Sequence, residues 1–400
     1  MELQYLVAIM GGHPRSLSFL FNEVSSKEKR NASVIDTLEA VWESFSAFMM
    51  STDFNWETVL KHALQGDEIR AQDVLDGCKV MTLLQRSVLL NDVDPKIAFR
   101  PHLPLLPLRH WCKNKGQGNR WLKVCLRHLI DAGLTLDYRT FEHFIHDFER
   151  LRGWALSDQP VSLSNFLKGA VCVLGNSNQT ITVPIPNENN EMRKQLPTKL
   201  GDLIEDISPG HYLPAQNQPA FDSFVVTEGV VVFFECRFSE LGASTTLSPH
   251  DDVYEKVALL RQQIQACHVQ FGNETLSEEN CVFVLVTRRD VPKGDFDEFV
   301  KAVKKGPSKP EQRARKTAAK EETEEETQKR EEKQRKKEEN KKKRKANWDS
   351  YSEFKGTVFL MDKSGLETHL GPTFAQLGGF VLSNPSKTEV MVTSGTGESS

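Results

Sequence analysis

Three charged residues border a hairpin pattern in the middle of the chain, and their types suit metal-ion chemistry. Asp222 and Glu235 flank a stretch rich in Val and Phe with Glu228-Gly229 at its centre, and Arg237 follows two residues later. A two-residue turn at Glu228-Gly229 predicts that Asp222 lies opposite Glu235, with Arg237 on the same face. Opposed carboxylates repel each other, and a divalent cation between them is the usual reason to keep such a pair. The alternative is an ordinary hairpin with charged ends.

The elements expected around the hairpin are those of a covered sheet. Both of its strands are apolar on both faces, so helices should pack on each side. The pattern predicts a helix at residues 196–207 before the hairpin, then an amphipathic helix at 252–266, a buried strand at 281–287 and a strand at 356–361. Charges at the open end of a buried strand are typical of active sites in α/β proteins.

The spacing of Asp222, twelve residues and then Glu235-x-Arg237 resembles the motif of the PD-(D/E)xK nuclease superfamily. The surrounding pattern resembles the nuclease domains of Crinkler effectors and retrotransposon-hot-spot proteins, over residues 195–385. The resemblance implies a restriction-endonuclease-like fold in which Asp222 and Glu235 hold Mg²⁺ or Mn²⁺. It also implies a secreted effector that acts on DNA in a host nucleus, with host proteins as further partners.

One departure from the family pattern leaves catalysis open. Arg237 occupies the lysine position, and arginine cannot act as a base, although it can neutralise a phosphate. The two hypotheses are a metal-dependent nuclease with Asp222, Glu235 and Arg237 in its centre, and a non-catalytic module that binds nucleic acid or host proteins. Glu205 is a candidate third carboxylate, or else part of a solvated helix face.

The first part of the chain, residues 1–155, has a helical pattern. Gly-Gly-His-Pro-Arg-Ser-Leu at residues 11–17 resembles the opening of the helical, winged-helix-like lid of Crinkler-type and related STAND ATPases. The chain contains no Gly-Lys dipeptide and hence no phosphate-binding loop, so we expect no ATP hydrolysis and no nucleotide cofactor. The motif would then be a remnant, or the chain a truncated product.

A basic segment lies at residues 100–130, which contain no Asp or Glu. Lys113, Lys115 and Arg120 belong to a polar loop between Trp111 and Trp121. Basic side chains interleaved with aromatics suit contact with a phosphate backbone. The alternative is a solvated loop beside a helical core.

Two further segments invite a structural interpretation. Residues 170–174 and 180–186 predict a hairpin within a connector at 156–195. Ser248-Pro249 followed by three polar residues predicts a capped helix start rather than a metal cluster.

A charged run separates the last expected strand from the others. Residues 320–345 carry nine acidic and twelve basic side chains, so this segment is either a solvated helix or disordered. The run ends in a candidate nuclear localisation signal or nucleic-acid-binding arm, with a solvated charge run as the alternative: Lys341, Lys342, Lys343, Arg344 and Lys345.

Composition sets the limits of these hypotheses. The net charge of −4 does not indicate a nucleic-acid binder as a whole, and the seven scattered cysteines suit a reducing compartment. No apolar stretch is long enough for a membrane helix, and no signal peptide is expected at the start. The expected fold class is α+α/β, with a helical region at 1–155, a connector at 156–195, a nuclease-like core at 196–303 and 347–385, a charged insertion at 304–346 and a disordered tail at 386–400.

Overall fold

The computed structural model describes a protein of mixed helix and sheet, as expected. The motif at residues 11–17, Lys115, Glu205 and the tail at 386–400 lie outside the described residues. Those described are 55–85, 98–113, 119–134, 138–157, 159–184, 195–196, 207–214, 218–238, 246–266, 269–271, 274–289, 295–307 and 324–375, with 18, 21, 40 and 377 in addition.

A seven-stranded mixed sheet forms the centre of the described structure, in the order β4-β13-β12-β9-β8-β7-β6. The three neighbouring strands β13, β12 and β9 run parallel, so their carboxyl ends meet at one edge. The seven strands are β4 (Val171–Leu174), β13 (Thr357–Met361), β12 (Cys281–Thr287), β9 (Val231–Arg237), β8 (Ser223–Val226), β7 (Gly210–Pro214) and β6 (Gln195–Leu196).

The β8–β9 hairpin has the turn and register that the sequence predicts. Thr227 N–H donates to Val230 O at 2.9 Å across the Glu228-Gly229 turn, and Gly229 adopts φ 83°, which glycine tolerates without strain. Ser223 pairs with Phe234, so the next position places Asp222 beside Glu235. The predicted hairpin is therefore confirmed.

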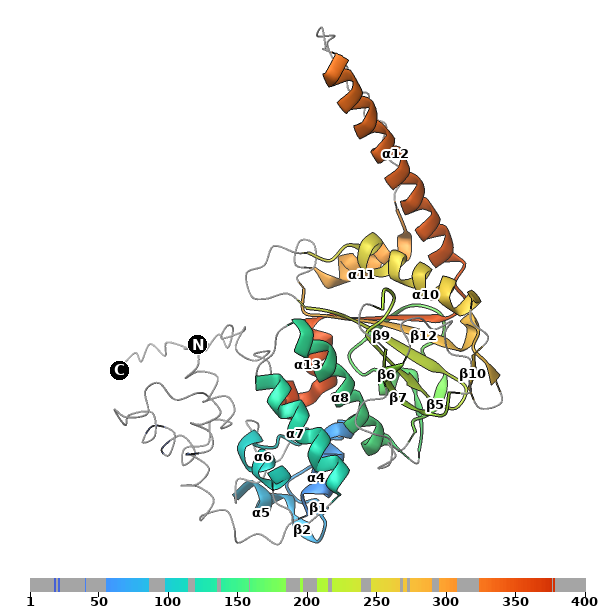
Figure 1. Cartoon of the computed structure of the whole chain (residues 1–400). Helices are drawn as coiled ribbons and strands as arrows, with labels where there is room; N and C mark the ends of the chain where they lie inside the picture. The colour runs from blue at the N-terminus through green and yellow to red at the C-terminus, as the bar shows by residue number, and fades with distance from the viewer. Residues whose placement is uncertain are drawn as a thin grey trace, which may run out of the picture.

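Helices cover both faces of the sheet, as its doubly apolar strands require (Figure 1). Phe233 of β9 faces a core formed with α10 (Glu255–Ala266), α11 (Phe296–Lys305) and the base of α12 (Glu324–Ser352). Phe234, its neighbour, faces the opposite core, formed with α8 (Tyr138–Leu156) and α13 (Lys363–Ala375).

The helical region of the first half shares this second core. Buried side chains run without interruption from Val59 through the α8 phenylalanines to Leu370 and Phe374 of α13. A buried hydrogen bond adds to the contact, because His369 Nε2 lies 2.5 Å from Glu149 Oε1. The other elements here are α4 (Trp56–Gln65), β1 (Val74–Leu75), β2 (Cys78–Lys79), α5 (Val80–Gln85), α6 (Leu105–Lys113) and α7 (Arg120–Leu134).

The predicted hairpin at residues 170–186 is wrong, although both of its strands exist. β4 pairs antiparallel with β13, whereas β5 (Thr180–Thr182) pairs with β3 (Pro160–Ser162), which leads into the short helix α9 (Leu163–Phe166). The turn packs against the start of β13, where Asn176 N–H donates to Thr357 Oγ1 at 3.2 Å. β4 therefore extends the main sheet and leaves β5 to a separate ribbon.

The helix expected at residues 196–207 is not confirmed at its start, because Leu196 lies in β6, which pairs with β7. Residues 197–206 are not among those described. The smaller elements beyond β9 are η3 (Pro249–Tyr254), β10 (Gln270–Phe271), β11 (Glu274–Thr275) and η4 (Glu278–Asn280).

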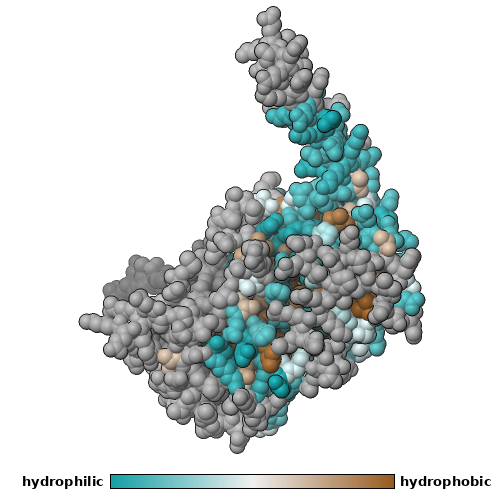
Figure 2. Space-filling view, viewed as in Figure 1, coloured by the Kyte–Doolittle hydropathy of each residue, from teal (hydrophilic) through white to brown (hydrophobic). Residues whose placement is uncertain are grey.

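The charged run is helical in its described part and projects from the body as α12 (Figure 1). Its side chains from Glu332 to Ala346 are exposed, and Figure 2 shows a hydrophilic surface along this projection. The helix continues past the expected boundary at residue 346, because Trp348 and Tyr351 pack on Tyr254 of η3, with ring centroids 5.0 and 4.8 Å away. No helix among the described residues has the length and apolar character needed to cross a membrane.

Candidate functional site

Glu235 is a buried carboxylate near the carboxyl end of β9. It is 1% exposed and lies on the sheet face that α10 covers. Its Oε1 atom is 2.7 Å from Arg237 Nη2 and 2.9 Å from Lys256 Nζ. Its Oε2 atom is buried and has no hydrogen-bond partner among the described residues. One oxygen is thus neutralised by two cations while the other remains available to a ligand.

Asp222 lies beside Glu235, as the hairpin register predicts. Its Oδ2 atom accepts a hydrogen bond of 2.6 Å from Cys236 N–H, which fixes the side chain against β9. Burial and the charge of Asp222 raise the pKa of Glu235 to about 8, despite Arg237 and Lys256 nearby. The predicted carboxylates are therefore close enough to repel each other.

Lys256 is a site residue that the sequence interpretation missed. It lies in the first turn of α10, and its Nζ contacts both Glu235 and Pro219 O. The packing of α10 across the end of β9 delivers this ammonium to the position beside the carboxylates. No fixed spacing links residue 256 to the hairpin motif, so the sequence offered no signal for it.

Arg237 is held between two carboxylates rather than pointing to solvent. Besides its contact with Glu235, its Nε donates to Asp252 Oδ1 at 3.1 Å. Arg289, just beyond the end of β12, approaches the same Asp252 oxygen at 3.3 Å. Asp252 therefore orients two guanidinium groups at the carboxyl edge of the sheet.

Glu142 of α8 is a third carboxylate of this region, and the sequence interpretation missed it as well. α8 reaches the end of β9, where the rings of Phe141 and Phe238 lie 5.5 Å apart. Burial and the charge of Asp222 raise the pKa of Glu142 to about 7. Glu205, the expected third carboxylate, lies outside the described residues.

Asp222 and Glu235 carry the type of oxygen donor that binds divalent cations. Burial also raises the pKa of Asp222, so each of these three carboxyl groups holds its proton more tightly than it would in water. Carboxylate oxygens are the ligands that Mg²⁺ and Mn²⁺ prefer, and the unpartnered Oε2 of Glu235 is one such ligand.

The segment before α10 is a capped helix start, as predicted. Ser248 Oγ accepts a hydrogen bond of 3.2 Å from Asp251 N–H, and Pro249 is the first residue of η3. Ligand atoms of His250, Asp251 and Glu255 lie within 4.8 Å of one another. However, Lys343 Nζ of α12 contacts Glu255 Oε1 at 2.8 Å, so a lysine of the protein already neutralises one carboxylate of this group.

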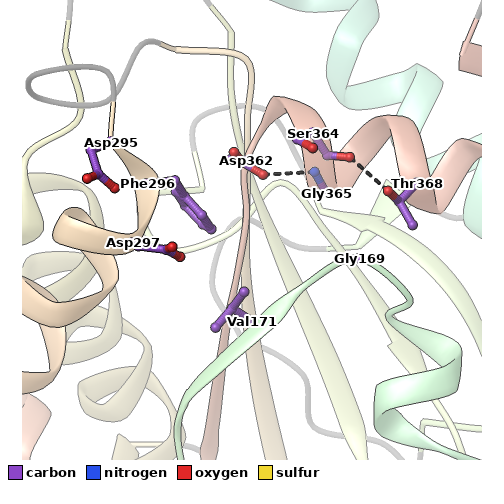
Figure 3. A pocket seen from close by; sticks show the side chains of 9 residues that line it. All are labelled: Gly169, Val171, Asp295, Phe296, Asp297, Asp362, Ser364, Gly365 and Thr368. Carbon is purple, nitrogen blue, oxygen red and sulfur yellow. Dashed lines mark hydrogen bonds between the residues drawn. The ribbon is translucent and has the colours of Figure 1, made fainter.

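A surface hollow of about 520 Å³ lies at the same sheet edge but beside β13 (Figure 3). Two of its aspartates cap helices, since Asp295 accepts from Glu298 N–H at 3.0 Å and Asp362 from Gly365 N–H at 2.8 Å. None of the carboxylates around Glu235 lines this hollow, capping explains Asp295 and Asp362, and the third aspartate, Asp297, lies in the first turn of α11. We therefore place the candidate site at the end of β9.

The basic loop of the helical region differs from the expected phosphate-binding surface. Lys113 and Arg120 are exposed, but Trp111 and Trp121 are buried. Each ring is covered by a cation of the protein itself: Lys123 Nζ lies 4.9 Å from the Trp111 centroid, and Arg150 Cζ 5.3 Å from that of Trp121. Stacking of bases on these tryptophans is therefore excluded in this conformation, and the role of the exposed cations stays a prediction.

The nuclear localisation signal predicted at Lys341–Lys345 lies on the exposed part of α12. Its exposure is compatible with recognition by an import receptor, although Lys343 is paired with Glu255. The import role stays a prediction.

Comparison with protein-family models, curated proteins and solved structures finds no match to this chain. The resemblance to Crinkler proteins and to PD-(D/E)xK nucleases therefore rests on the motif and its surroundings alone.

The raised pKa values predict an unusual pH dependence. The Glu235 carboxyl titrates near 4.5 when unfolded but near 8 when folded, so the folded protein binds more protons between these values. Stability should therefore fall as the pH rises through this window. We expect the Tm of metal-free protein to fall from about pH 5 to about pH 8, and added Mg²⁺ to oppose the fall because it stabilises ionised carboxylates.

Thermal melts in chelator and in Mg²⁺ across this range measure the effect. Glu235→Gln is the control, since its amide does not titrate, and its melts should vary less with pH and respond less to Mg²⁺. Equal pH slopes for the wild type and Glu235→Gln would contradict the assignment.

Proposed function

We propose that this chain is a Mg²⁺- or Mn²⁺-dependent nuclease that cleaves DNA at a centre formed by Asp222, Glu235 and Lys256. The observation that carries the proposal is the position of Lys256 Nζ, 2.9 Å from Glu235 Oε1. It supplies the ammonium that the arginine at position 237 does not. Two carboxylates with an adjacent lysine can supply the metal ligands and the cation that metal-assisted hydrolysis of a phosphodiester uses.

The residues divide the work as follows. Asp222 and Glu235 would hold the cation, and Glu142 would add negative charge to the same region. When bound, a divalent cation stabilises charge on the phosphate and lowers the pKa of water. The ammonium of Lys256 is a hydrogen-bond donor, so its Nζ can orient the attacking water.

Arg237 has a different part in this proposal. Its guanidinium stays protonated and is fixed by Glu235 and Asp252. A fixed cation at the edge of the centre would neutralise the phosphate as negative charge develops in the transition state. In this proposal Lys256 takes the role that the lysine of the family pattern has, and Arg237 at the motif position neutralises the phosphate.

The alternative is a non-catalytic module of the same fold that binds nucleic acid or a host protein. The observation in its favour is that two cations already neutralise one oxygen of Glu235 and that this side chain is buried. In that case the carboxylate cluster would be a structural ion-pair network.

Plasmid nicking separates the two. We expect supercoiled DNA to be cut with Mg²⁺ or Mn²⁺, and not in chelator or by Asp222→Ala. Asp222→Asn serves as the second variant, because its amide can still accept the Cys236 hydrogen bond and so preserve the fold. Absence of cleavage by folded wild-type protein under both metals would favour the binding module.

A further inference from the structure

We propose that α12 is a rigid arm that binds the phosphate backbone of duplex DNA through a basic stripe formed by Lys333, Lys337, Lys341 and Arg344. The inference deepens the proposed function, because it assigns a substrate-holding surface to the same protein. It rests on where the charges lie on the helix, how its base is anchored, and what lies beside that base.

The basic stripe occupies one side of α12. Its members are separated by four, four and three residues, so they lie above one another on an α-helix. The acidic side chains of this part of the helix, Glu332, Glu338 and Glu339, fall outside the stripe. Glu332 instead pairs with Lys336, at 2.7 Å, on another side. The helix thus separates a purely cationic side from a mixed one.

The basic stripe continues into the face that anchors the helix to the body. Trp348 lies four residues after Arg344 and Tyr351 three residues further, so both share its side. These two rings pack on Tyr254 of η3. The stripe therefore lies on the body-facing side of a helix that projects beyond the globular part (Figures 1 and 2).

The anchor fixes the direction of the arm. Trp348 and Tyr351 also contact each other, at 5.6 Å between ring centroids, and Tyr254 Oη donates to Val303 O at 3.1 Å. Gly306, at the end of α11, has no room for a side chain, since a Cβ atom there would lie 2.3 Å from Trp348 Cζ2. A helix held by such close packing projects at a defined angle rather than swinging freely.

The anchored end of α12 adjoins the candidate site. Lys343, which lies beside the stripe on α12, contacts Glu255 Oε1 through its Nζ, and Glu255 precedes Lys256, whose Nζ contacts Glu235. A polyanion lying along the body-facing side of α12 would therefore be led towards the carboxylate centre.

Charge and composition identify the partner as a nucleic acid rather than a membrane. The whole chain has a net charge of −4, yet residues 333–345 hold nine Lys or Arg and two Glu, which is +7. This segment has no apolar side chain, whereas a helix that lies on a lipid surface needs an apolar face. The stripe from Lys333 to Arg344 is about 16 Å long, the rise of about five base pairs.

The affinity for a fluorescently labelled duplex of about 30 base pairs, measured by anisotropy in the presence of chelator, tests whether α12 binds DNA. The stripe variant is Lys333→Gln, Lys337→Gln and Lys341→Gln together. The matched control is Arg335→Gln, Lys336→Gln and Lys342→Gln, which removes the same charge from other sides of the same helix. At about 0.1 M salt the stripe variant should bind at least about tenfold more weakly, and its salt slope should fall by about 2 to 3. The control should lose less than about threefold.

Two outcomes would overturn the arm. Equal losses in both variants would show a net-charge effect without a stripe, and unchanged affinity in both would show that α12 does not bind DNA. Circular dichroism and Tm confirm that both variants fold. Tight binding of wild-type protein to vesicles of phosphatidylserine and phosphatidylcholine, with weak DNA binding, would assign the arm to a membrane and overturn the proposal too.

Chelator keeps this test separate from catalysis. If the stripe binds DNA but no metal supports cleavage, the DNA-binding role of α12 is supported and the proposed nuclease activity is rejected. If cleavage persists while the stripe variant binds DNA as tightly as the wild type, only the DNA-binding role of α12 is rejected.

Discussion

Replacing Lys256 with methionine is expected to lower metal-dependent DNA cleavage by a factor of about 100 to 1,000. Methionine keeps most of the length and removes the ammonium that lies 2.9 Å from Glu235 Oε1. Arg237→Lys, by contrast, retains a positive charge at its position and should keep or raise the rate, because lysine is smaller and can shift its pKa. Initial rates of loss of supercoiled plasmid, at matched metal and salt, measure both.

The comparison of these two variants decides which cation is essential. A loss at Lys256→Met with activity kept in Arg237→Lys supports the assignment of the lysine role to α10. The reverse pattern would return that role to position 237 and contradict the proposed division of work. The rise in Tm on adding Mn²⁺ should persist in Lys256→Met, since the carboxylates remain, and this shows that the variant still folds and binds metal.

The largest loss of stability is expected at Arg152, far from the candidate site. Its side chain is 1% exposed and donates to three backbone oxygens, Leu64 O at 2.7 Å, Asn165 O at 2.9 Å and Phe166 O at 3.1 Å. Arg152→Met would remove all three hydrogen bonds, two of which are buried. We expect a loss of about 3 to 5 kcal/mol in the free energy of unfolding.

Chemical denaturation of the wild type and Arg152→Met measures this loss. Arg335→Met on the exposed part of α12 is the matched control and should change the free energy by less than about 0.5 kcal/mol. A midpoint for Arg152→Met equal to that of the control would contradict the structural role.

The hairpin could be predicted because its determinants are local. Glu228-Gly229 defines the turn, and the two apolar runs on either side leave one register in which Asp222 meets Glu235. The capped start at Ser248 is local in the same sense. The part of the site that could be predicted from the sequence is therefore the part whose determinants lie within about 15 residues of each other.

The remaining site residues depend on packing between distant elements. Lys256 joins the site because α10 crosses the end of β9, and Glu142 because α8 reaches the same point from the opposite face. The failed prediction at residues 170–186 has the same origin, since β4 finds its partner in β13, almost two hundred residues later in the chain. Periodicity identifies a strand, but its pairing partner is decided by the assembled sheet.

The docking of α13 on the helical region has a consequence for how the protein is made. Glu149 is synthesised before its hydrogen-bond partner, His369, which lies 220 residues later in the chain. At about 5 to 20 residues per second, a ribosome needs about 10 to 45 s to add that stretch. During this interval the helices made first expose part of their core and a buried carboxylate without its partner. The nascent chain should therefore depend on chaperones until its last helix emerges, and fragments that end before residue 363 should aggregate.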